Sequence, residues 1–230
     1  MKVIFDHSEN ITDSINTFWF KPEHKVDYTA GQFIELYLEH PNQDDRGIKR
    51  WFTLSSSPSE ELISITTRLS SEAVSTFKQA LWKLKPGDAV KMVEPMGDFV
   101  LPIDPSVPLL FTIGGIGITP VRSMVKWLMD NNQKREITLL YAAGKESELA
   151  FIDLFTQYDL KLETLVGANR ESTIAKFVEH HVRFHEQKPH GLMYISGPEM
   201  LVESAVEHLK QHSITQEQLI TDYFPNYQKI

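Results

Sequence analysis

Cysteine is absent from this sequence of 230 residues. Its absence excludes disulfides, zinc sites built on thiolates and cysteine-ligated iron–sulfur clusters. Long runs of lysine or arginine are also missing, and the formal net charge is -8, so no nucleic-acid-binding surface is expected. The sequence has no apolar signal segment, and no apolar run approaches the roughly 20 residues that span a membrane. We therefore expect a soluble, cytoplasmic protein without a membrane span.

The composition is that of a globular protein, with 41% hydrophobic and 23% charged residues in a chain long enough for one large or two ordinary domains. Up to about residue 103, short runs that alternate apolar and polar residues are separated by turn residues. These runs lie at 15–20, 33–38 and 62–67, and a helical stripe follows at 72–82. Many short strands at this spacing predict a small antiparallel barrel or sandwich.

The periodicity changes after a stretch that contains Pro102, Pro105 and Pro108, which we interpret as a linker. Beyond it, short apolar runs alternate with helical patterns. Strands are expected at 109–113, 137–141, 162–166, 192–195 and 219–222, and helices at 120–132, 148–155, 174–181 and 199–210. This alternation predicts a parallel sheet covered by helices on both faces.

A glycine-rich turn at 109–120 joins an apolar strand to a helix. Gly115 and Gly117 lack side chains where phosphates would approach, the Thr119 hydroxyl is suited to cap the helix, and Pro120 fits its first turn. Backbone N–H groups and the positive end of the helix dipole would then face a phosphate. A turn that merely allows helix and strand to pack closely is the alternative. The spacing G-x-G-x-x-P differs from the usual dinucleotide fingerprint, so both interpretations stay open.

A second stretch, RWFTLSSSP at 50–58, lies at the end of an expected barrel strand. An arginine fork suits a pyrophosphate, aromatic side chains offer a stacking surface for a flat ring, and hydroxyls bond ring heteroatoms. By itself, the stretch favours the alternative of a strand with inward aromatics and a solvated serine-rich turn.

Taken together, the motifs of the chain resemble those of the ferredoxin–NADP⁺ reductase-like flavoproteins. The resemblance covers nearly the whole chain and rests on several ordered segments at compatible spacings, which are more specific together than any one alone. They are YTAGQF (28–33), RWFT (50–53), PGD (86–88), EPMGDF (94–99), GGIGITP (114–120) and SGPEM (196–200).

The resemblance implies a β plus α/β protein of two domains. An N-terminal antiparallel Greek-key β-barrel with one helix would bind the flavin at 1–104. A C-terminal parallel α/β nucleotide-binding sheet would bind NAD(P) at 105–230. The resemblance also implies FAD as the cofactor, with FMN less favoured, and NAD(P)H as co-substrate.

In the family's flavin motif, an arginine binds the flavin phosphates, an aromatic residue stacks on the isoalloxazine and a hydroxyl bonds N5. The resemblance assigns these roles to Arg50, Phe52 and Thr53. Phe52 stands where tyrosine is usual, which preserves stacking but loses the phenol hydrogen bond. The family's Gly-Gly before the phosphate helix is replaced by SSEAVS at 70–75. The implied flavin set comprises Arg50, Trp51, Phe52, Thr53, Ser55, Thr66, Thr67 and Ser75.

The glycine turn is similar to the family's pyridine-nucleotide loop. Arg170, with Lys145 in the preceding loop, would contact a 2′-phosphate and so favour NADPH over NADH, although an exposed loop arginine without a ligand is the alternative. The implied NAD(P) set comprises Gly114, Gly115, Gly117, Thr119, Pro120, Lys145, Arg170, Gly197 and Pro198.

The resemblance also implies a catalytic group where the two rings meet. Ser196 replaces a cysteine that in many relatives lies near the nicotinamide C4 and the flavin N5. Serine keeps the small size and a donor but loses thiol polarizability, so hydride transfer is expected to be slower. The final segment, 225–230, would close over the site or fray. The expected catalytic residues are Thr53, Ser196, Asp222, Tyr223 and Phe224.

No metal site is expected. His181 and His185 are spaced i, i+4, but no partner carboxylate completes an H-E-x-x-H pattern. We interpret the pair as a solvated helix end.

The resemblance implies a flavoprotein reductase that passes hydride from NAD(P)H to bound FAD and then electrons to a separate acceptor, a ferredoxin- or flavodoxin-like carrier protein or a small molecule. A free-flavin or ferric-complex reductase is the first alternative. An electron-transfer subunit with little nucleotide turnover is the second.

Overall fold

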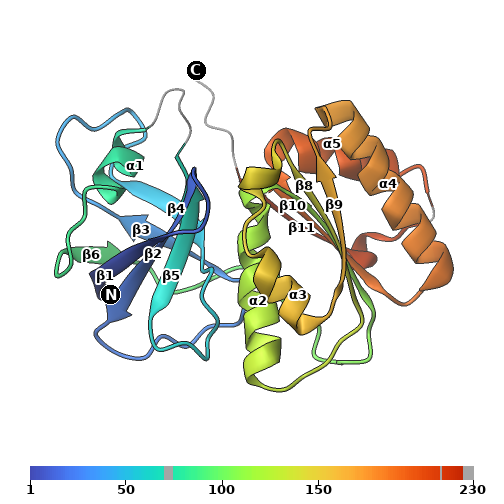
Figure 1. Ribbon diagram of the computed structural model, residues 1–230, viewed down its shortest axis with the longest axis horizontal. Coiled ribbons are helices and arrows are strands. Elements are labelled where there is room, and N and C mark those ends of the chain that lie inside the picture. Colours follow the sequence, from blue (N-terminus) through green and yellow to red (C-terminus); the bar gives the residue numbers. More distant parts are fainter. Residues whose placement is uncertain (70–74, 213, 225–230) are drawn as a thin grey trace.

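Two sheets lie side by side, the first built from the N-terminal half of the chain and the second from the C-terminal half (Figure 1). The structure is a computed structural model that describes residues 1–69, 75–212 and 214–224. The first sheet comprises β1 (Lys2–Asn10), β2 (Ile15–Pro22), β3 (Phe33–Tyr37), β4 (Lys49–Thr53), β5 (Ile63–Arg68) and β6 (Ala89–Met92).

The first sheet closes into an antiparallel barrel. Its strand order is β4-β3-β6-β1-β2-β5, and the insertion of β6 between β3 and β1 gives the sheet a Greek-key order. Leu54 forms an antiparallel bridge with Ile65, and the Ser55 N–H donates to the Ser64 carbonyl at 2.8 Å, so the two edge strands meet. This confirms the predicted antiparallel barrel.

Every second side chain of a strand points into the barrel, because successive strand residues point to opposite faces. Ile34 and Leu36 of β3 are buried, with Glu35 between them on the other face. The helix α1 (Thr76–Leu81) buries Phe77 and Leu81 against the barrel core. The beginning of the helix predicted at 72–82 lies outside the described residues.

The second sheet is parallel throughout, with the order β11-β10-β7-β8-β9. Within the described residues, four helices and three short 3-10 turns connect its strands, as the alternating pattern predicts. The strands are β7 (Leu109–Gly114), β8 (Ile137–Ala143), β9 (Lys161–Val166), β10 (Leu192–Pro198) and β11 (Leu219–Phe224). The helices are α2 (Thr119–Asp130), α3 (Ile152–Tyr158), α4 (Arg170–Gln187) and α5 (Glu199–Leu209), and the 3-10 turns are η1 (Gly115–Ile118), η2 (Glu146–Glu148) and η3 (Gln216–Gln218).

Helices cover both faces of the parallel sheet. On one face, α2 and α3 pack against residues such as Leu139 and Tyr141. On the other face, α4 and α5 pack against Leu140 and Ala142 (Figure 1). In the described part of the chain, none of the helices combines the length and apolarity that crossing a membrane requires.

The α2 face also carries the contact between the two parts. Ile15, Ala30 and Phe99 from the N-terminal part belong to the same buried cluster as Met124 of α2. The barrel and the sheet are therefore joined by shared apolar packing as well as by the chain.

Some element boundaries differ from the sequence predictions. The helix predicted at 148–155 is displaced, because Phe151 has a positive φ of 65° and α3 begins only after it. The helix predicted at 174–181 is longer, since the Asn169 side chain caps it by accepting from the Ser172 N–H at 2.8 Å. The short strand β6 and most of β1 lack a clear alternation and were not predicted.

Candidate functional site

Close packing against β10 and the helix after it explains why the turn has glycine at two of its positions. A Cβ on Gly117 would lie 2.7 Å from both the carbonyl carbon and the oxygen of Ser196, so only glycine fits there. A Cβ on Gly114 would lie 2.5 Å from the Leu201 side chain. Gly115 differs, because its φ is +55° and its Cβ would meet no described atom within 4 Å beyond its chain neighbours. Gly115 is therefore the position in the turn that leaves room for a ligand.

The start of α2 differs from the prediction. The Thr119 hydroxyl donates to the Ile116 carbonyl at 3.2 Å, and α2 has no side-chain cap. The expected Thr119 cap is therefore wrong, because η1 precedes the helix and directs the hydroxyl backward. Pro120 does lie in the first turn, where its missing N–H costs no helical hydrogen bond.

The carboxyl edge of the parallel sheet gathers the glycine turn and the predicted catalytic residues of the second part. Ser196 is aligned with Ile113 of β7 on one side and with Asp222 of β11 on the other. Tyr223, opposite Gly197, is 50% exposed. Phe224 ends β11 next to Pro198, and the tail after it lies outside the described residues. Ligands bind at this edge in open α/β sheets.

Ser196 and Asp222 are unusual polar groups at this edge. The Ser196 side chain is fully buried, and its Oγ has no hydrogen-bond partner among the described residues. Burial raises the pKa of the Asp222 carboxyl to about 6, against a backbone hydrogen bond from Tyr223 that lowers it. A buried hydroxyl without a partner is rare in folded proteins, and a hydrogen bond to a ligand would explain it.

Arg50 lies at the other half of the predicted site, on β4 of the barrel. Its guanidinium donates from Nη2 to Asp44 Oδ1 at 2.9 Å. Its Nη1 donates to the carbonyls of Arg46, Gly47 and Lys49 at 2.8, 3.1 and 2.6 Å. The side chain is 7% exposed, so the structure places it in a cage of acceptors rather than in open solvent.

The two aromatic residues after Arg50 point in opposite directions. Phe52 is buried in the barrel core, with its ring centroid 5.9 Å from that of Phe77. Trp51 is 59% exposed, packs beside Phe33, and donates from Nε1 to Glu35 at 3.0 Å. Phe52 therefore already has an aromatic neighbour on α1.

Ser55 and Thr66 belong to a closed network of buried hydroxyls. Thr66 Oγ1 donates to Ser55 Oγ at 2.8 Å, and Ser55 Oγ lies 2.9 Å from Ser64 Oγ. Thr17 Oγ1 lies 2.8 Å from Thr66 Oγ1. These hydroxyls satisfy one another and join β2 and β5 to the segment that follows β4. Thr53 and Thr67 are buried at the same end of the barrel.

A cluster of positive charges near α1 was not predicted from the sequence. Lys78 donates from Nζ to the Arg68 carbonyl at 2.7 Å, and Ser75 caps α1 by accepting from the Lys78 N–H. Burial and the positive charges of Arg68, Arg46 and Arg50 lower the pKa of the Lys78 ammonium to about 8. These four cations, which we call the α1 cation cluster, come from separate segments, so no single motif contains them.

An ionic contact spans the two parts of the molecule. Arg122 of α2 donates from Nη1 to the Ser55 carbonyl at 2.9 Å and from Nη2 to Glu60 at 3.0 Å, and its Nη1 also bonds the second Glu60 oxygen. The Ser123 hydroxyl donates to the Ser56 carbonyl. The helix that follows the glycine turn is thus bonded to the segment that follows the Arg50 motif.

Comparisons with known proteins agree with this geometry. Residues 111–207 match the family model described as the oxidoreductase NAD-binding domain. The structure resembles ferredoxin-NADP+ reductase from Plasmodium falciparum, with a TM-score of 0.81 at 16% identity over 97% of this chain and 95% of that chain. The chain therefore shares the two-domain fold of the ferredoxin–NADP⁺ reductases. The flavohem-like FAD/NAD binding domain of nitric oxide dioxygenase from Vibrio cholerae matches with a TM-score of 0.77 at 19% identity, over 97% of this chain and 98% of that one.

Curated relatives are longer than this chain. An NADPH oxidoreductase from Mycobacterium tuberculosis is 36% identical over 148 residues, which are 61% of this chain and 37% of the relative. A component of the Na(+)-translocating NADH-quinone reductase from Neisseria meningitidis is 25% identical over 235 aligned positions, 88% of this chain and 58% of the relative. The chain therefore spans between about a third and three-fifths of the length of these relatives.

Within the reductase-like fold, Lys145 and Arg170 lie beyond the carboxyl ends of β8 and β9. Lys145 precedes η2 and Arg170 opens α4, and both side chains are exposed. Neither side chain has a hydrogen bond or an ion pair with another described residue, so both charges are available at this edge.

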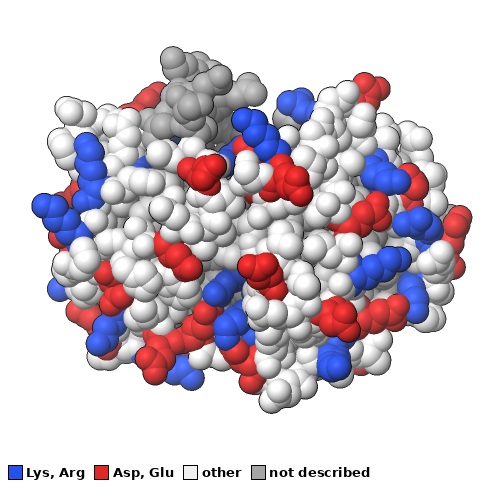
Figure 2. Space-filling view, viewed as in Figure 1, with Lys and Arg blue, Asp and Glu red and all other residues white. Residues whose placement is uncertain are grey.

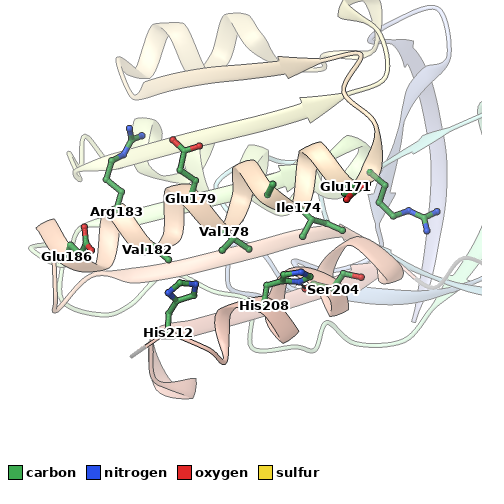
Figure 3. Close-up of a pocket in the computed structure, with 12 residues that line it drawn as sticks. Glu171, Ile174, Val178, Glu179, Val182, Arg183, Glu186, Ser204, His208 and His212 are labelled. Carbon is green, nitrogen blue, oxygen red and sulfur yellow. Dashed lines mark hydrogen bonds between the residues drawn. The ribbon is translucent and has the colours of Figure 1, made fainter.

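A groove of the described residues lies away from this edge. It has a volume of about 1050 Å³ between α4 and α5, with Ile174, Val178 and Val182 on its floor and Glu179, Arg183 and His208 among its rim residues (Figure 3). Of the predicted site residues, only Arg170 lines it.

The histidine pair differs from its prediction. His181 is fully buried on α4 and shares a hydrogen bond with the Phe177 carbonyl at 2.8 Å, so the interpretation as a solvated helix end is wrong. Burial lowers the pKa of His181 to about 4. Among the described residues, no group of three or more potential ligands is arranged to hold a metal ion.

Proposed function

We propose that this chain is an NAD(P)H-dependent flavin oxidoreductase. The observation that carries the proposal is the placement of two unlike half-sites against each other. The glycine turn with Ser196 and Asp222 forms one half, and the β4–β5 end of the barrel with the α1 cation cluster forms the other. The turn η1 packs near β5, and Arg122 bonds the two halves together. The relatives named as reductases support the same chemistry.

The residues present fit a flavin in the barrel half. The α1 cation cluster supplies positive charge for a phosphate or pyrophosphate, and Thr53 lies at the end of β4 that faces the second part. We assign FAD as the cofactor, with FMN less favoured, and the implied flavin set as its contacts, except Ser55 and Thr66, whose buried hydroxyls already bond each other. When bound, the flavin would supply hydride acceptance and one- or two-electron release.

The carboxyl edge of the parallel sheet fits NAD(P)H. Gly115 leaves open space at the turn, and the N-terminal end of α2 favours the negative charge of a pyrophosphate. Ser196 would orient the reacting rings through its free hydroxyl, and Asp222 would hold a proton nearby. Lys145 and Arg170 would contact the 2′-phosphate of NADPH.

The acceptor is proposed to be a separate molecule, either a ferredoxin- or flavodoxin-like carrier or a small compound. On the face shown in Figure 2, acidic and basic side chains of the described residues are interspersed, so this face offers no single-sign patch to a charged carrier.

The Asp44–Arg50 ion pair favours the alternative of a free-flavin or ferric-complex reductase, because it competes with a flavin phosphate. An electron-transfer subunit with little nucleotide turnover is the remaining alternative.

Anaerobic mixing tests the proposal. The purified protein is saturated with FAD, mixed with NADPH or NADH without oxygen, and followed by flavin absorbance. Bleaching with either nucleotide is expected. If neither nucleotide bleaches the flavin, the reductase proposal is wrong. A protein that is colourless as purified but reduces added flavin would identify the free-flavin alternative.

The nucleotide preference is tested by Arg170→Ala. Loss of one charge-assisted phosphate contact should raise the KM for NADPH roughly 10-fold and leave the KM for NADH unchanged. Arg183→Ala, on the same helix but away from the sheet edge, is the control and should alter neither constant. Equal effects of Arg170→Ala on both nucleotides would show that Arg170 does not contact the 2′-phosphate.

A further inference from the structure

The loop at 38–48, between β3 and β4, carries a carboxylate into the α1 cation cluster. Asp44 Oδ1 accepts from Arg50 Nη2 at 2.9 Å and from the Arg46 N–H at 3.1 Å, while Oδ2 accepts from Arg46 Nη2 at 2.9 Å. Burial opposes its ionisation, yet the hydrogen bond from Arg46 and the charges of both arginines lower the pKa of Asp44 to about 2. The group is therefore a permanent anion at neutral pH.

This loop is anchored to the first turn of α1. Thr76 Oγ1 accepts from the Asp44 N–H at 3.1 Å and lies 3.0 Å from His40 Nε2. Asp44 is thus held in place by its backbone as well as by its side chain. The loop and the helix form one unit around Arg50.

Asp44 is already bonded to the guanidinium that we propose as the partner of a flavin phosphate. A phosphate bound to Arg50 would present oxygens to the same guanidinium and would meet a carboxylate already bonded to it. Two like charges near one arginine repel each other, so the bound carboxylate weakens the binding of a phosphate to the same guanidinium.

We propose that Asp44 is a specificity-determining residue that weakens the binding of phosphorylated flavins by holding Arg50 and Arg46 in place of the flavin phosphate. This inference rests on the proposed function. FAD or FMN competes with the carboxylate and with its Thr76-anchored loop, so both flavins are held less tightly than they would be without Asp44. A flavin without a phosphate does not compete with Asp44.

The remaining charges support a site that still accepts an anion. Arg68 is paired with Glu148 at 3.3 Å, and Asp44 is paired with both Arg46 and Arg50 at 2.9 Å. The positive charges of the cluster attract a phosphate, while Asp44 sets how tightly the phosphate is held. Asp44 therefore tunes affinity without abolishing it.

The experiment compares three flavins on three proteins. Dissociation constants for riboflavin, FMN and FAD are measured by fluorescence titration on the unsubstituted protein, Asp44→Asn and Asp45→Asn. Asp45 is the matched control, because it is an exposed carboxylate in the same loop that has no ion pair with a described residue. We expect Asp44→Asn to bind FMN and FAD about 10-fold more tightly, since a charged competitor is removed, and riboflavin unchanged. Asp45→Asn should leave all three constants within a factor of two, about the scale of a surface charge.

Several outcomes decide the inference. Unchanged or weaker binding of FMN and FAD to Asp44→Asn overturns it, as does an equal gain for riboflavin. If Asp44→Asn does not fold, Thr76→Val releases the loop without changing charge and should speed FMN association, and an unchanged association rate overturns the inference. Failure of every flavin, riboflavin included, to bind the unsubstituted protein refutes the proposed function instead.

Discussion

The Ser196 hydroxyl is expected to lower the stability of the ligand-free protein and to contribute to the proposed chemistry. A buried hydroxyl without a partner costs free energy in the ligand-free protein, and the described residues supply it with none. The proposed function gives this hydroxyl a ligand, and its place between Ile113 and Asp222 at the sheet edge agrees with that role.

Ser196→Ala is therefore expected to stabilise the ligand-free protein by about 1 kcal/mol while slowing flavin reduction by NAD(P)H. Ser123→Ala is the matched control, because that buried hydroxyl does donate to the Ser56 carbonyl, and its loss should destabilise the protein by about 1 kcal/mol. Denaturant unfolding measures both changes, and anaerobic single turnover measures the reduction. Equal destabilisation by the two substitutions would mean that Ser196 has a structural partner.

Single residues show what could be predicted from the sequence and what could not. The family motifs assign Arg50 and Ser196 to two half-sites, and the two residues lie on β4 of the barrel and on β10 of the parallel sheet. The sequence could not reveal that Asp44 binds Arg50, because this contact depends on how the 38–48 loop folds back. Thr119 illustrates the opposite error, since its predicted capping role ignored the 3-10 turn before the helix.

At the scale of elements, the strand–turn–helix unit β7–η1–α2 is set by its glycines. Gly117 is required because the backbone of Ser196 lies against it, whereas Gly115 faces open space with a positive φ. The same turn thus contains one position for packing and one that is free for a ligand.

Alanine substitutions should separate these roles. Gly117→Ala must displace the end of β10 and is expected to destabilise the protein by more than about 2 kcal/mol. Gly115→Ala is expected to cost only about 1 kcal/mol of backbone strain, and to raise the KM for NAD(P)H because its methyl group enters the open space. Thermal unfolding and steady-state kinetics test both variants. A larger stability loss for Gly115→Ala would reverse the assignment.

Elements with strong periodicity were the ones that could be predicted. The apolar stripe of α2 and the buried runs of β7 and β8 match their expected positions closely, because they lie between a sheet and the barrel or inside the sheet. The boundary near Phe151 could not be predicted, since its left-handed conformation accompanies a tertiary contact, in which the Tyr141 hydroxyl accepts from the Ala150 N–H at 3.2 Å. The sequence pattern predicts a helix across Phe151, but tertiary packing holds this residue in a left-handed conformation and delays the start of α3.

At the scale of the whole molecule, the proposed function requires the two parts to keep a fixed position relative to each other. Arg122 lies over the ring of Trp19 at 5.5 Å and is bonded to Glu60 and to the Ser55 carbonyl. Glu60 also accepts from the Ser57 N–H at 2.6 Å. Ser55 and Glu60 follow the Arg50 motif in the sequence, and Arg122 follows the glycine turn. This contact therefore sets the distance between the two proposed half-sites.

Arg122→Ala should lower the rate of flavin reduction in anaerobic single turnover roughly 10-fold or more, because small misplacements of reacting rings are costly. The dissociation constant for NADPH should stay unchanged, since the nucleotide edge itself is intact. Arg122→Lys should recover part of the rate by restoring the charge opposite Glu60. Lys126→Ala, one turn along the same helix and paired only with Asp130 among the described residues, should have no effect on either quantity.

An unchanged reduction rate in Arg122→Ala would show that shared apolar packing around Met124 alone maintains the alignment, whereas a loss of NADPH affinity would place Arg122 in the nucleotide site.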